Sequence, residues 1–110
     1  GKQDNGKKRR TYKVRHMDRE IMDELCTVVD FGGKILDVVV EHDIYGQIAA
    51  DLIINSRADA EAFVRKVEQY KTNPLCRLTD GIHFHTVEAE NERILDCIGE
   101  ELKKKGYLLK

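Results

Sequence analysis

Apolar residues recur along this chain with two different spacings. Alternation with a period of two predicts half-buried strands, and it runs through residues 11–16, 35–42, 48–54 and 82–88. Apolar residues three and four positions apart predict amphipathic helices, and they follow Asp18, Ser56 and Glu88. With a short final edge strand at 107–109, the order is β-α-β-β-α-β-α-β. This order predicts an α+β fold, a two-layer sandwich of three amphipathic helices on a mostly antiparallel sheet.

The second and third alternating runs are predicted to form a hairpin. Residues 43–46, Asp-Ile-Tyr-Gly, have turn chemistry and separate the two runs. His42 ends an apolar face that it shares with Val38 and Val40. His42 is either a site residue or a hydrogen-bonded histidine at a strand end, and Tyr45 either lines a site or covers the hairpin.

The fourth alternating run carries the candidate chemistry. His83 and His85 are two positions apart and therefore project to the same side, about 6.5 to 7 Å apart along the strand. That spacing suits chelation of a metal ion. The other face, with Ile82, Phe84 and Thr86, is predicted to face the core. The alternative is that the histidines are half-buried polar residues of a two-faced sheet.

Two further polar residues lie beside predicted elements. His16 stands at the end of the first strand. Glu24 lies at the flank of the apolar stripe of the first helix, three residues after Ile21 and four before Val28. A carboxylate there can reach toward the sheet edge. The alternative for Glu24 is a solvated residue at the flank of the helix.

Composition limits the class of protein. A chain of 110 residues fits one domain with a core of its own. Nineteen basic and twenty acidic residues give a net charge of −1, so the chain as a whole lacks the electrostatic signature of a protein that binds nucleic acid or a membrane surface. Its 3 cysteines are odd in number and widely spaced, and it has neither a signal peptide nor a long apolar run. A reduced, soluble, cytoplasmic protein is expected.

Residues 1–10 form a separate segment at the N-terminus. They contain no large apolar residue and end in Lys7-Lys8-Arg9-Arg10. Clustered charge with low hydrophobicity does not offset the entropy of ordering, so this segment is predicted to be a flexible basic tail or linker. An arm that touches DNA is the alternative.

Several blocks of residues, taken in order, resemble one known family. They are His16 before an acidic helix, Val39-Val40-Glu41-His42 with Tyr45-Gly46, Ser56-Arg57, Pro74-Leu75, and Thr79-x-Gly81-Ile82-His83-Phe84-His85-Thr86. Together they resemble the three-histidine (3H) domain, the ligand-binding half of niacin-responsive bacterial repressors of NAD biosynthesis and salvage. The resemblance runs from about Tyr12 to the C-terminus. Asp43 departs from the pattern, because the family usually has proline there, but no ligand is expected at that position.

The resemblance implies a metal site and a ligand. The positions that match the family's metal ligands are His16, Glu24, His83 and His85. They imply one divalent transition metal per chain, either Zn, Ni, Fe or Mn. The family senses nicotinic acid, which is therefore expected as the co-repressor, with its pyridine nitrogen or carboxylate near the metal. His42 and Tyr45 are weaker candidates for lining the ligand site or for supporting the metal ligands.

The resemblance also implies partners. In the family, a winged helix-turn-helix domain precedes this one and binds DNA, and such a domain is absent from this chain. Residues 11–110 are therefore expected to be the regulatory domain alone, with operator DNA bound only through an upstream helix-turn-helix domain. A homodimer is expected because operators with two half-sites require symmetric dimers, whereas no membrane partner is expected.

Two other classes of function stay open. A small metalloenzyme, such as a hydrolase with metal-bound water, would need Glu24, Glu88 or Asp80 as its general base. A plain dimerisation module would carry its histidines for structure only. The leading prediction is a metal-dependent nicotinic acid sensor of a transcriptional repressor, without enzyme activity.

Overall fold

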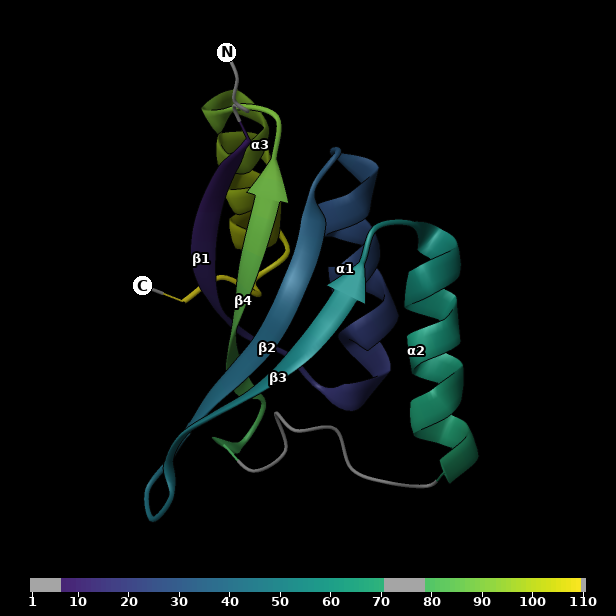
Figure 1. Cartoon of the computed structure of the whole chain (residues 1–110), viewed down its shortest axis with the longest axis vertical. Coiled ribbons are helices and arrows are strands. Elements are labelled where there is room, and N and C mark those ends of the chain that lie inside the picture. The colour runs from purple at the N-terminus through teal and green to yellow at the C-terminus, as the bar shows by residue number, and fades with distance from the viewer. Residues whose placement is uncertain (1–6, 71–78, 110) are drawn as a thin grey trace.

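The structure, a computed structural model, describes residues 7–70 and 79–109 (Figure 1). The elements are β1 (Lys8–Arg15), the short 3-10 helix η1 (Asp18–Glu20), α1 (Ile21–Asp30), β2 (Lys34–His42), β3 (Gly46–Ile54), α2 (Arg57–Tyr70), β4 (Ile82–Ala89) and α3 (Glu92–Lys104). Near the C-terminus, Leu108 forms an isolated bridge with Val14 where the final edge strand was expected. The predicted α+β class and order of elements are confirmed.

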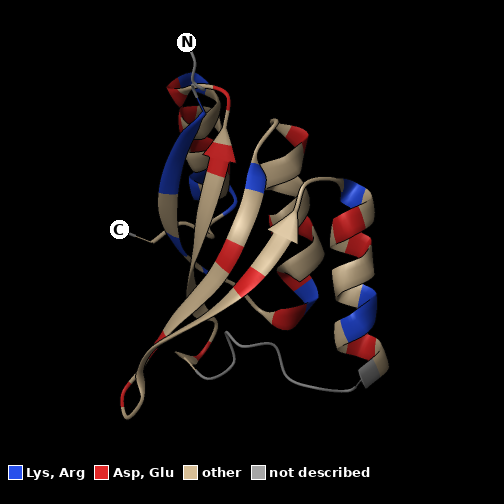
Figure 2. Cartoon of the chain, viewed as in Figure 1, with Lys and Arg blue, Asp and Glu red and all other residues tan. Residues whose placement is uncertain are grey.

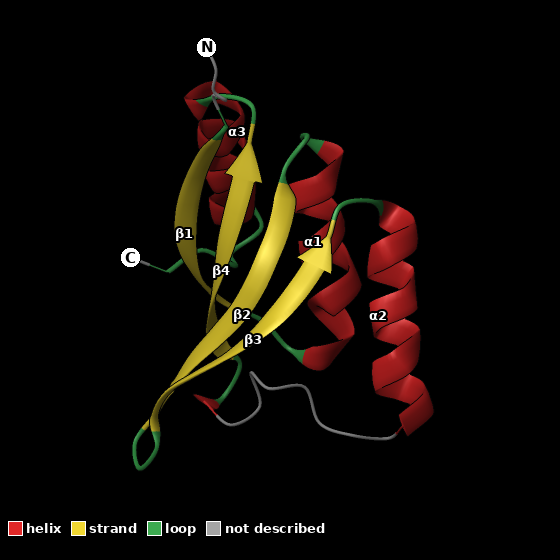
Figure 3. Cartoon of the chain, in the orientation of Figure 1, coloured by secondary structure: helices red, strands yellow, loops and turns green. Residues whose placement is uncertain are grey.

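The described strands form one antiparallel sheet in the order β1-β4-β2-β3. The helices lie together on one face of this sheet, and the opposite face is uncovered by them (Figure 3). α1 contacts β2 and both other helices, while α3 covers β1 and β4, and α2 covers β3. This arrangement is the two-layer sandwich that the sequence predicted, and we call the uncovered side of the sheet the open face.

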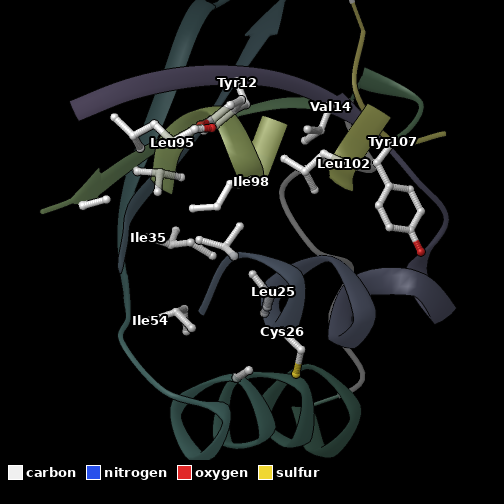
Figure 4. Close-up of a cluster of buried hydrophobic side chains, with 14 of the residues drawn as sticks. Tyr12, Val14, Leu25, Cys26, Ile35, Ile54, Leu95, Ile98, Leu102 and Tyr107 are labelled. Atoms are coloured by element: carbon white, nitrogen blue, oxygen red, sulfur yellow. The ribbon is translucent and has the colours of Figure 1, made fainter. Parts of the chain in front are cut away.

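The core fills the space between the sheet and the helices. Buried side chains from all these elements meet there, and those labelled in Figure 4 are Tyr12, Val14, Leu25, Cys26, Ile35, Ile54, Leu95, Ile98, Leu102 and Tyr107. The turn from α1 into β2 is packed so closely that a Cβ on Gly33 would lie 2.7 Å from Ile98 Cδ1 and 2.9 Å from Val28 Cγ1. Glycine is therefore required at this turn for space rather than for backbone freedom.

The predicted faces of β4 are reversed in the structure. His83, His85 and Val87 are buried under the helices, whereas Phe84 and Thr86 are half-buried on the open face. The period of two was right, but the prediction of which side faces the core was wrong. Because β4 carries apolar residues on both faces, hydrophobicity alone does not identify the buried one.

Two boundaries also differ from the prediction. β1 begins at Lys8, so Lys8–Arg10, expected in the flexible tail, are part of the sheet and pair with β4. In β2 the register with β4 shifts between Ile35 and Val39. Ile35 and Val40 are therefore both buried, although in a regular strand residues five positions apart would lie on opposite faces. This bulge breaks the single apolar face that was predicted for β2.

Three smaller findings complete the fold. Within residues 7–70 and 79–109, no helix is both long and apolar enough to cross a membrane. Cys26 is buried and Cys97 is exposed, and both are free thiols. The predicted block Pro74-Leu75 and Cys76 lie outside the described residues.

Candidate metal centre

The four residues predicted as metal ligands converge in the structure. Glu24, in the first turn of α1, has Oε1 2.8 Å from His16 Nε2 and 3.4 Å from His85 Nε2, and Oε2 3.2 Å from His83 Nε2. The exposed fraction of these side chains is 1% for His16, 2% for Glu24 and His83, and 5% for His85. Of the two alternatives for Glu24, the solvated one is therefore excluded. We call these four residues the histidine cluster.

The chain turns on either side of the cluster bring its members together. His16 lies where β1 turns into η1, and this turn is held by Met17 N–H donating to Glu20 Oε1 at 2.7 Å. Gly81, just before β4, has a φ of +86°, and a Cβ there would lie 2.6 Å from the carbonyl oxygen of His16. The turn into β4 thus approaches the end of β1 at a distance that only glycine allows.

The second ring nitrogen of each histidine is held by a backbone carbonyl. Nδ1 lies 2.9 Å from Met17 O in His16, 2.9 Å from Gly81 O in His83, and 2.6 Å from Asp37 O in His85. A carbonyl oxygen can only accept, so these partners assign the proton to Nδ1 in all three rings. In its neutral form each ring then presents the Nε2 lone pair to Glu24, as a metal ligand would.

The bulge in β2 supplies one of these carbonyls. Asp37 lies in the segment where β2 loses register with β4, and its own carboxylate accepts hydrogen bonds from Thr86 N at 2.8 Å and Thr86 Oγ1 at 2.9 Å. These bonds fix the bulge, and the bulge places the Asp37 carbonyl against His85. Sequence reasoning missed this role, although an acidic residue inside the most strand-like run of the chain was its signal.

The charges of the cluster depend on one another. Burial alone would raise the pKa of Glu24, but His85, His16 and His83 together hold that pKa well below its ordinary value. Burial would lower the pKa of His16 and of His85, but the Glu24 carboxylate raises both pKa values above 6.5. One buried carboxylate cannot balance the positive charges of a protonated His16 and a protonated His85 at the same time, so protons alone satisfy this site poorly.

The residues fit a metal ion. Donor atoms of His16, Glu24 and His83 lie within 4.8 Å of one another, and this group could hold a metal. Ligand atoms around a tetrahedral zinc are roughly 3.3 Å apart, as follows from zinc–nitrogen distances of about 2.0–2.1 Å. The separations around Glu24 are close to that value. Imidazole and carboxylate donors suit several first-row transition metals and do not select one.

A hollow lies beside the cluster. It has a volume of about 500 Å³, and its lining residues are His16, Met17, Asp18, Arg19, Asp80 and Gly81. His16 is the cluster member that borders it, so a small molecule in the hollow would lie next to a candidate metal ligand. Arg19, an exposed residue of η1, lines the same hollow. Sequence reasoning did not single out Arg19, which carried no signal beyond its closeness to His16.

The other two predicted site residues lie elsewhere. His42 and Tyr45 are at the tip of the β2–β3 hairpin, which extends beyond the rest of the sheet (Figure 1). Their rings stack with centroids 5.1 Å apart, and Tyr45 is 76% exposed. His42 Nδ1 accepts hydrogen bonds from Ile44 N at 3.2 Å and Tyr45 N at 3.3 Å. The structure thus joins His42 to its own turn rather than to the histidine cluster.

The fold and the buried cluster define a small α+β domain with a candidate metal site. The sequence model of the 3H domain family matches residues 9–110, and the chain belongs to this family. It is 44% identical over 100 residues to the probable transcription repressor NiaR of Thermotoga maritima, covering 91% of this chain and 57% of the relative. It is 33% identical over 95 residues to the transcription repressor NadR of Bacillus subtilis, covering 86% of this chain and 53% of that relative. The chain therefore spans little more than half the length of these curated relatives.

Proposed function

We propose that this chain is the metal-dependent, nicotinic acid-sensing regulatory domain of a bacterial transcriptional repressor that controls NAD biosynthesis or salvage. The observation that carries the proposal is the convergence of three imidazole Nε2 atoms on one buried carboxylate, with every Nδ1 held by a carbonyl. Support for a repressor comes from the two relatives, both named as transcription repressors. Operator DNA is then bound by an upstream helix-turn-helix domain, in the part of such a protein that this chain does not span.

In this proposal His16, Glu24, His83 and His85 hold one divalent transition metal per chain. The bound ion supplies a positive charge and a coordination position for an electron-pair donor of the ligand. The protein supplies the rest. The Nδ1 hydrogen bonds orient the rings, and burial keeps competing water away from the cluster.

The proposal places nicotinic acid, a small ring with a carboxylate, in the hollow beside His16. Two carboxylates, Asp18 and Asp80, also line this hollow, and Asp80 is paired with Arg15. Charge-assisted hydrogen bonds make guanidinium groups good partners for carboxylates, and Arg19 lines this hollow. Gly81 and Met17 supply a wall of backbone and apolar side chain on which an aromatic ring can rest. The ligand would thus contact η1 and the turn before β4 at once.

Regulation follows from differential binding. A co-repressor shifts a repressor toward its DNA-binding state only by binding that state more tightly. Because the hollow lies between η1 and the turn into β4, ligand binding there biases how these two segments pack. That packing is the element through which the domain signals to its DNA-binding partner.

The contacts of the candidate general bases do not favour a hydrolase. Glu88 pairs with Arg9 at 3.1 Å on the open face, and Asp80 pairs with Arg15 at 3.0 Å. Glu24 itself is enclosed by the three imidazoles, which leaves no free carboxylate oxygen for proton transfer. A regulatory domain without catalysis is the simpler use of this arrangement.

Calorimetric titration of nicotinic acid into the metal-loaded and the chelator-stripped protein tests the proposal, after elemental analysis of the sample. Saturable binding only in the loaded form, with about one metal per chain, is expected. Arg19→Gln should weaken the binding of nicotinic acid more than the binding of the uncharged nicotinamide, and it should leave the metal content unchanged. Arg65→Gln, on the exposed side of α2, is the matched control. Absence of binding in both forms would overturn the sensor.

A further inference from the structure

Residues 105–109 follow α3 and connect the end of β1 to the start of α1, and we call them the C-terminal segment. The backbone of this segment is bonded to β1 at several points. One of them lies next to the histidine cluster, where Arg15 N–H donates to Tyr107 O at 2.8 Å. Because Arg15 directly precedes His16, the segment is fixed beside one of the candidate metal ligands.

Tyr107 contacts His16 and α1 at the same time. Its ring meets the His16 ring edge to face, with the centroids 5.8 Å apart and an angle of 72° between the two planes. Its hydroxyl donates to Asp23 Oδ2 at 2.8 Å, and Figure 4 shows this hydroxyl pointing toward the start of α1. Tyr107 is buried, and Asp23 directly precedes Glu24. One buried side chain thus touches one candidate ligand and the neighbour of another.

Lys105 binds the same carboxylate. Its Nζ lies 3.0 Å from Asp23 Oδ1 and 2.9 Å from Thr27 Oγ1. Figure 2 shows the basic residues at the end of α3 and the acidic residues where α1 begins. The Asp23 side chain is 53% exposed, and ion pairs as exposed as this one contribute little to stability. The more specific consequence of these bonds is therefore the position of the first turn of α1.

The end of α3 does not need these side-chain contacts. Two backbone bonds already close the helix, because Leu102 O accepts from Tyr107 N at 2.9 Å and from Leu108 N at 3.2 Å. The hydroxyl of Tyr107 and the ammonium of Lys105 both point instead to α1. A role in the metal centre explains this direction, whereas a role in ending the helix does not.

We propose that Tyr107 is a positioning residue of the metal centre, and that a bound metal in turn stabilises the C-terminal segment. The ring of Tyr107 orients His16, and its hydroxyl holds Asp23 and with it Glu24. A metal requires such control, because donor atoms around zinc must keep a spacing close to 3.3 Å, as the zinc–nitrogen distances of roughly 2.0–2.1 Å dictate. The inference rests on the proposed metal site and adds a residue to it.

The second half of the proposal follows from linkage. If opening of the C-terminal segment weakens metal binding by some factor, a bound metal must disfavour that opening by the same factor. The segment lies along the edge of β1, so metal occupancy of a buried cluster acquires an effect at the surface of the domain. Such an effect is measurable without DNA and without nicotinic acid.

Two substitutions of Tyr107 separate its ring from its hydroxyl. Tyr107→Leu removes both contacts and should lower zinc affinity about 10–100-fold in competition with a chromophoric chelator, as loss of a supporting group does. Tyr107→Phe keeps the ring against His16 and should lose less affinity. In the metal-free protein, the nitrogen-15 shifts of the His16 ring should change in the Leu variant and stay close to native in the Phe variant.

Tyr12→Phe is the matched control. Tyr12 is another buried tyrosine, and its hydroxyl donates to Leu95 O in α3 rather than to a neighbour of the cluster. Its loss should lower stability but leave zinc affinity and the His16 shifts unchanged. Asp23→Asn, at an exposed position, tests the link to α1 even where Tyr107→Leu does not fold, and it too should weaken zinc binding.

Hydrogen exchange tests the coupling in the other direction. Leu109 N–H donates to Lys13 O at 2.8 Å and reports opening of the C-terminal segment. Zinc should slow its exchange at least about fivefold in the native chain, the lower end of typical coupling between sites, and less in Tyr107→Leu. The amide of Ile44, which donates to His42 at the distant hairpin tip, should exchange equally fast with and without zinc.

The possible failures are distinguishable. Native zinc affinity and native His16 shifts in Tyr107→Leu, or in Asp23→Asn where the Leu variant does not fold, would overturn the positioning role and leave the metal site standing. Exchange of Leu109 that does not respond to zinc would overturn the coupling. A native chain that binds no zinc would remove the proposed metal site, and this inference with it.

Discussion

The histidine cluster and the tip of the β2–β3 hairpin were both predicted to belong to a site. Their histidines differ in how the backbone hydrogen-bonds to the ring nitrogens. In the histidine cluster, each Nδ1 donates to a carbonyl, and Nε2 is left facing Glu24. At the hairpin tip, His42 Nδ1 instead accepts two backbone N–H groups, so its neutral ring carries the proton on Nε2. Residue type alone does not make a metal ligand. The partner of the other ring nitrogen decides whether a lone pair is available.

The largest effect is expected at Glu24, which is the only anion in the cluster. Glu24→Gln should lower metal affinity by more than the roughly 10–100-fold that follows loss of a supporting hydrogen bond. Competition with a chromophoric chelator measures this loss. Glu61→Gln, on the exposed surface of α2, should bind metal like the native chain. Equal affinity in both variants would show that the cluster is not the metal site.

The second effect compares two glycines with positive φ. Gly81→Ala should lower the free energy of unfolding by about 1–3 kcal/mol, because it adds backbone strain and a Cβ 2.6 Å from His16 O. Gly46→Ala, at the hairpin tip, has a φ of +75° but nothing within 4 Å of its Cβ, so it should be milder. Denaturant unfolding of both variants gives the difference. A Gly46 variant that is as unstable as the Gly81 variant would contradict the role of close approach.

The third effect concerns Asp37 as a positioning residue. Asp37→Ala removes the bonds to Thr86 that fix the bulge, and it should lower metal affinity roughly 10–100-fold without removing a ligand. Asp37→Asn keeps one acceptor oxygen and should recover part of the affinity. The measurement is metal competition together with the nitrogen-15 shifts of the His85 ring. An unchanged His85 signal in the Ala variant would refute this role.

The fourth effect is that the stability of the metal-free fold and the stabilisation by a bound metal depend on pH in opposite directions. Because His16 and His85 have raised pKa values in the folded chain, their protonation stabilises the metal-free fold below pH 6.5. This stabilisation is lost as the pH rises through the folded-state pKa values. Because Glu24 has a lowered pKa in the folded chain, its ionised carboxylate stabilises the metal-free fold above pH 4.5. That contribution is lost as the pH falls toward the folded-state pKa.

Metal binding requires neutral imidazoles, so the stabilisation by zinc should grow as pH rises. Melting temperatures of metal-free and zinc-saturated protein, measured at pH 6 and pH 8, would reveal the two trends. The first pH lies about half a unit below the ordinary histidine pKa, and the second lies well above it. Parallel trends in the two samples would count against the cluster as the metal site.

The smallest effect is expected at the hairpin tip. His42→Ala should leave metal affinity within about twofold and stability within about 0.5 kcal/mol, the range of ordinary surface substitutions. His83→Ala, on the buried face of β4, should by contrast abolish stoichiometric binding. If His42→Ala removes nicotinic acid binding while metal stays bound, the hairpin tip belongs to the ligand site, and this region keeps the lining role that the sequence predicted.

Local patterns were enough to predict most of the fold. The hairpin of β2 and β3 followed from two alternating runs around a turn, and the inward residues of α3 followed from helical spacing. The start of β1 was missed because Lys8–Arg10 lack apolar residues. Their pairing with β4 and the bonds from Arg10 to Glu92 and Asp96 hold them in the sheet.

The candidate site was predictable in part. Two-residue spacing placed His83 and His85 on one side of β4, and the family resemblance joined His16 and Glu24 to them. Asp37 and Arg19 were missed, because their roles depend on a bulge and on a turn that bring distant segments together. No period in the sequence reports such contacts.

The sequence by itself determined the order of the elements and the common side of His83 and His85, because periodicity depends only on neighbours along the chain. The tertiary structure decided which face of β4 is buried, which nitrogen of each histidine is free, and which side chain of the C-terminal segment contacts His16. Those properties depend on residues as far apart as Glu24 and His83 in α1 and β4. Burial of a charged residue is favourable only when partners from other elements meet it, and only the folded chain supplies them.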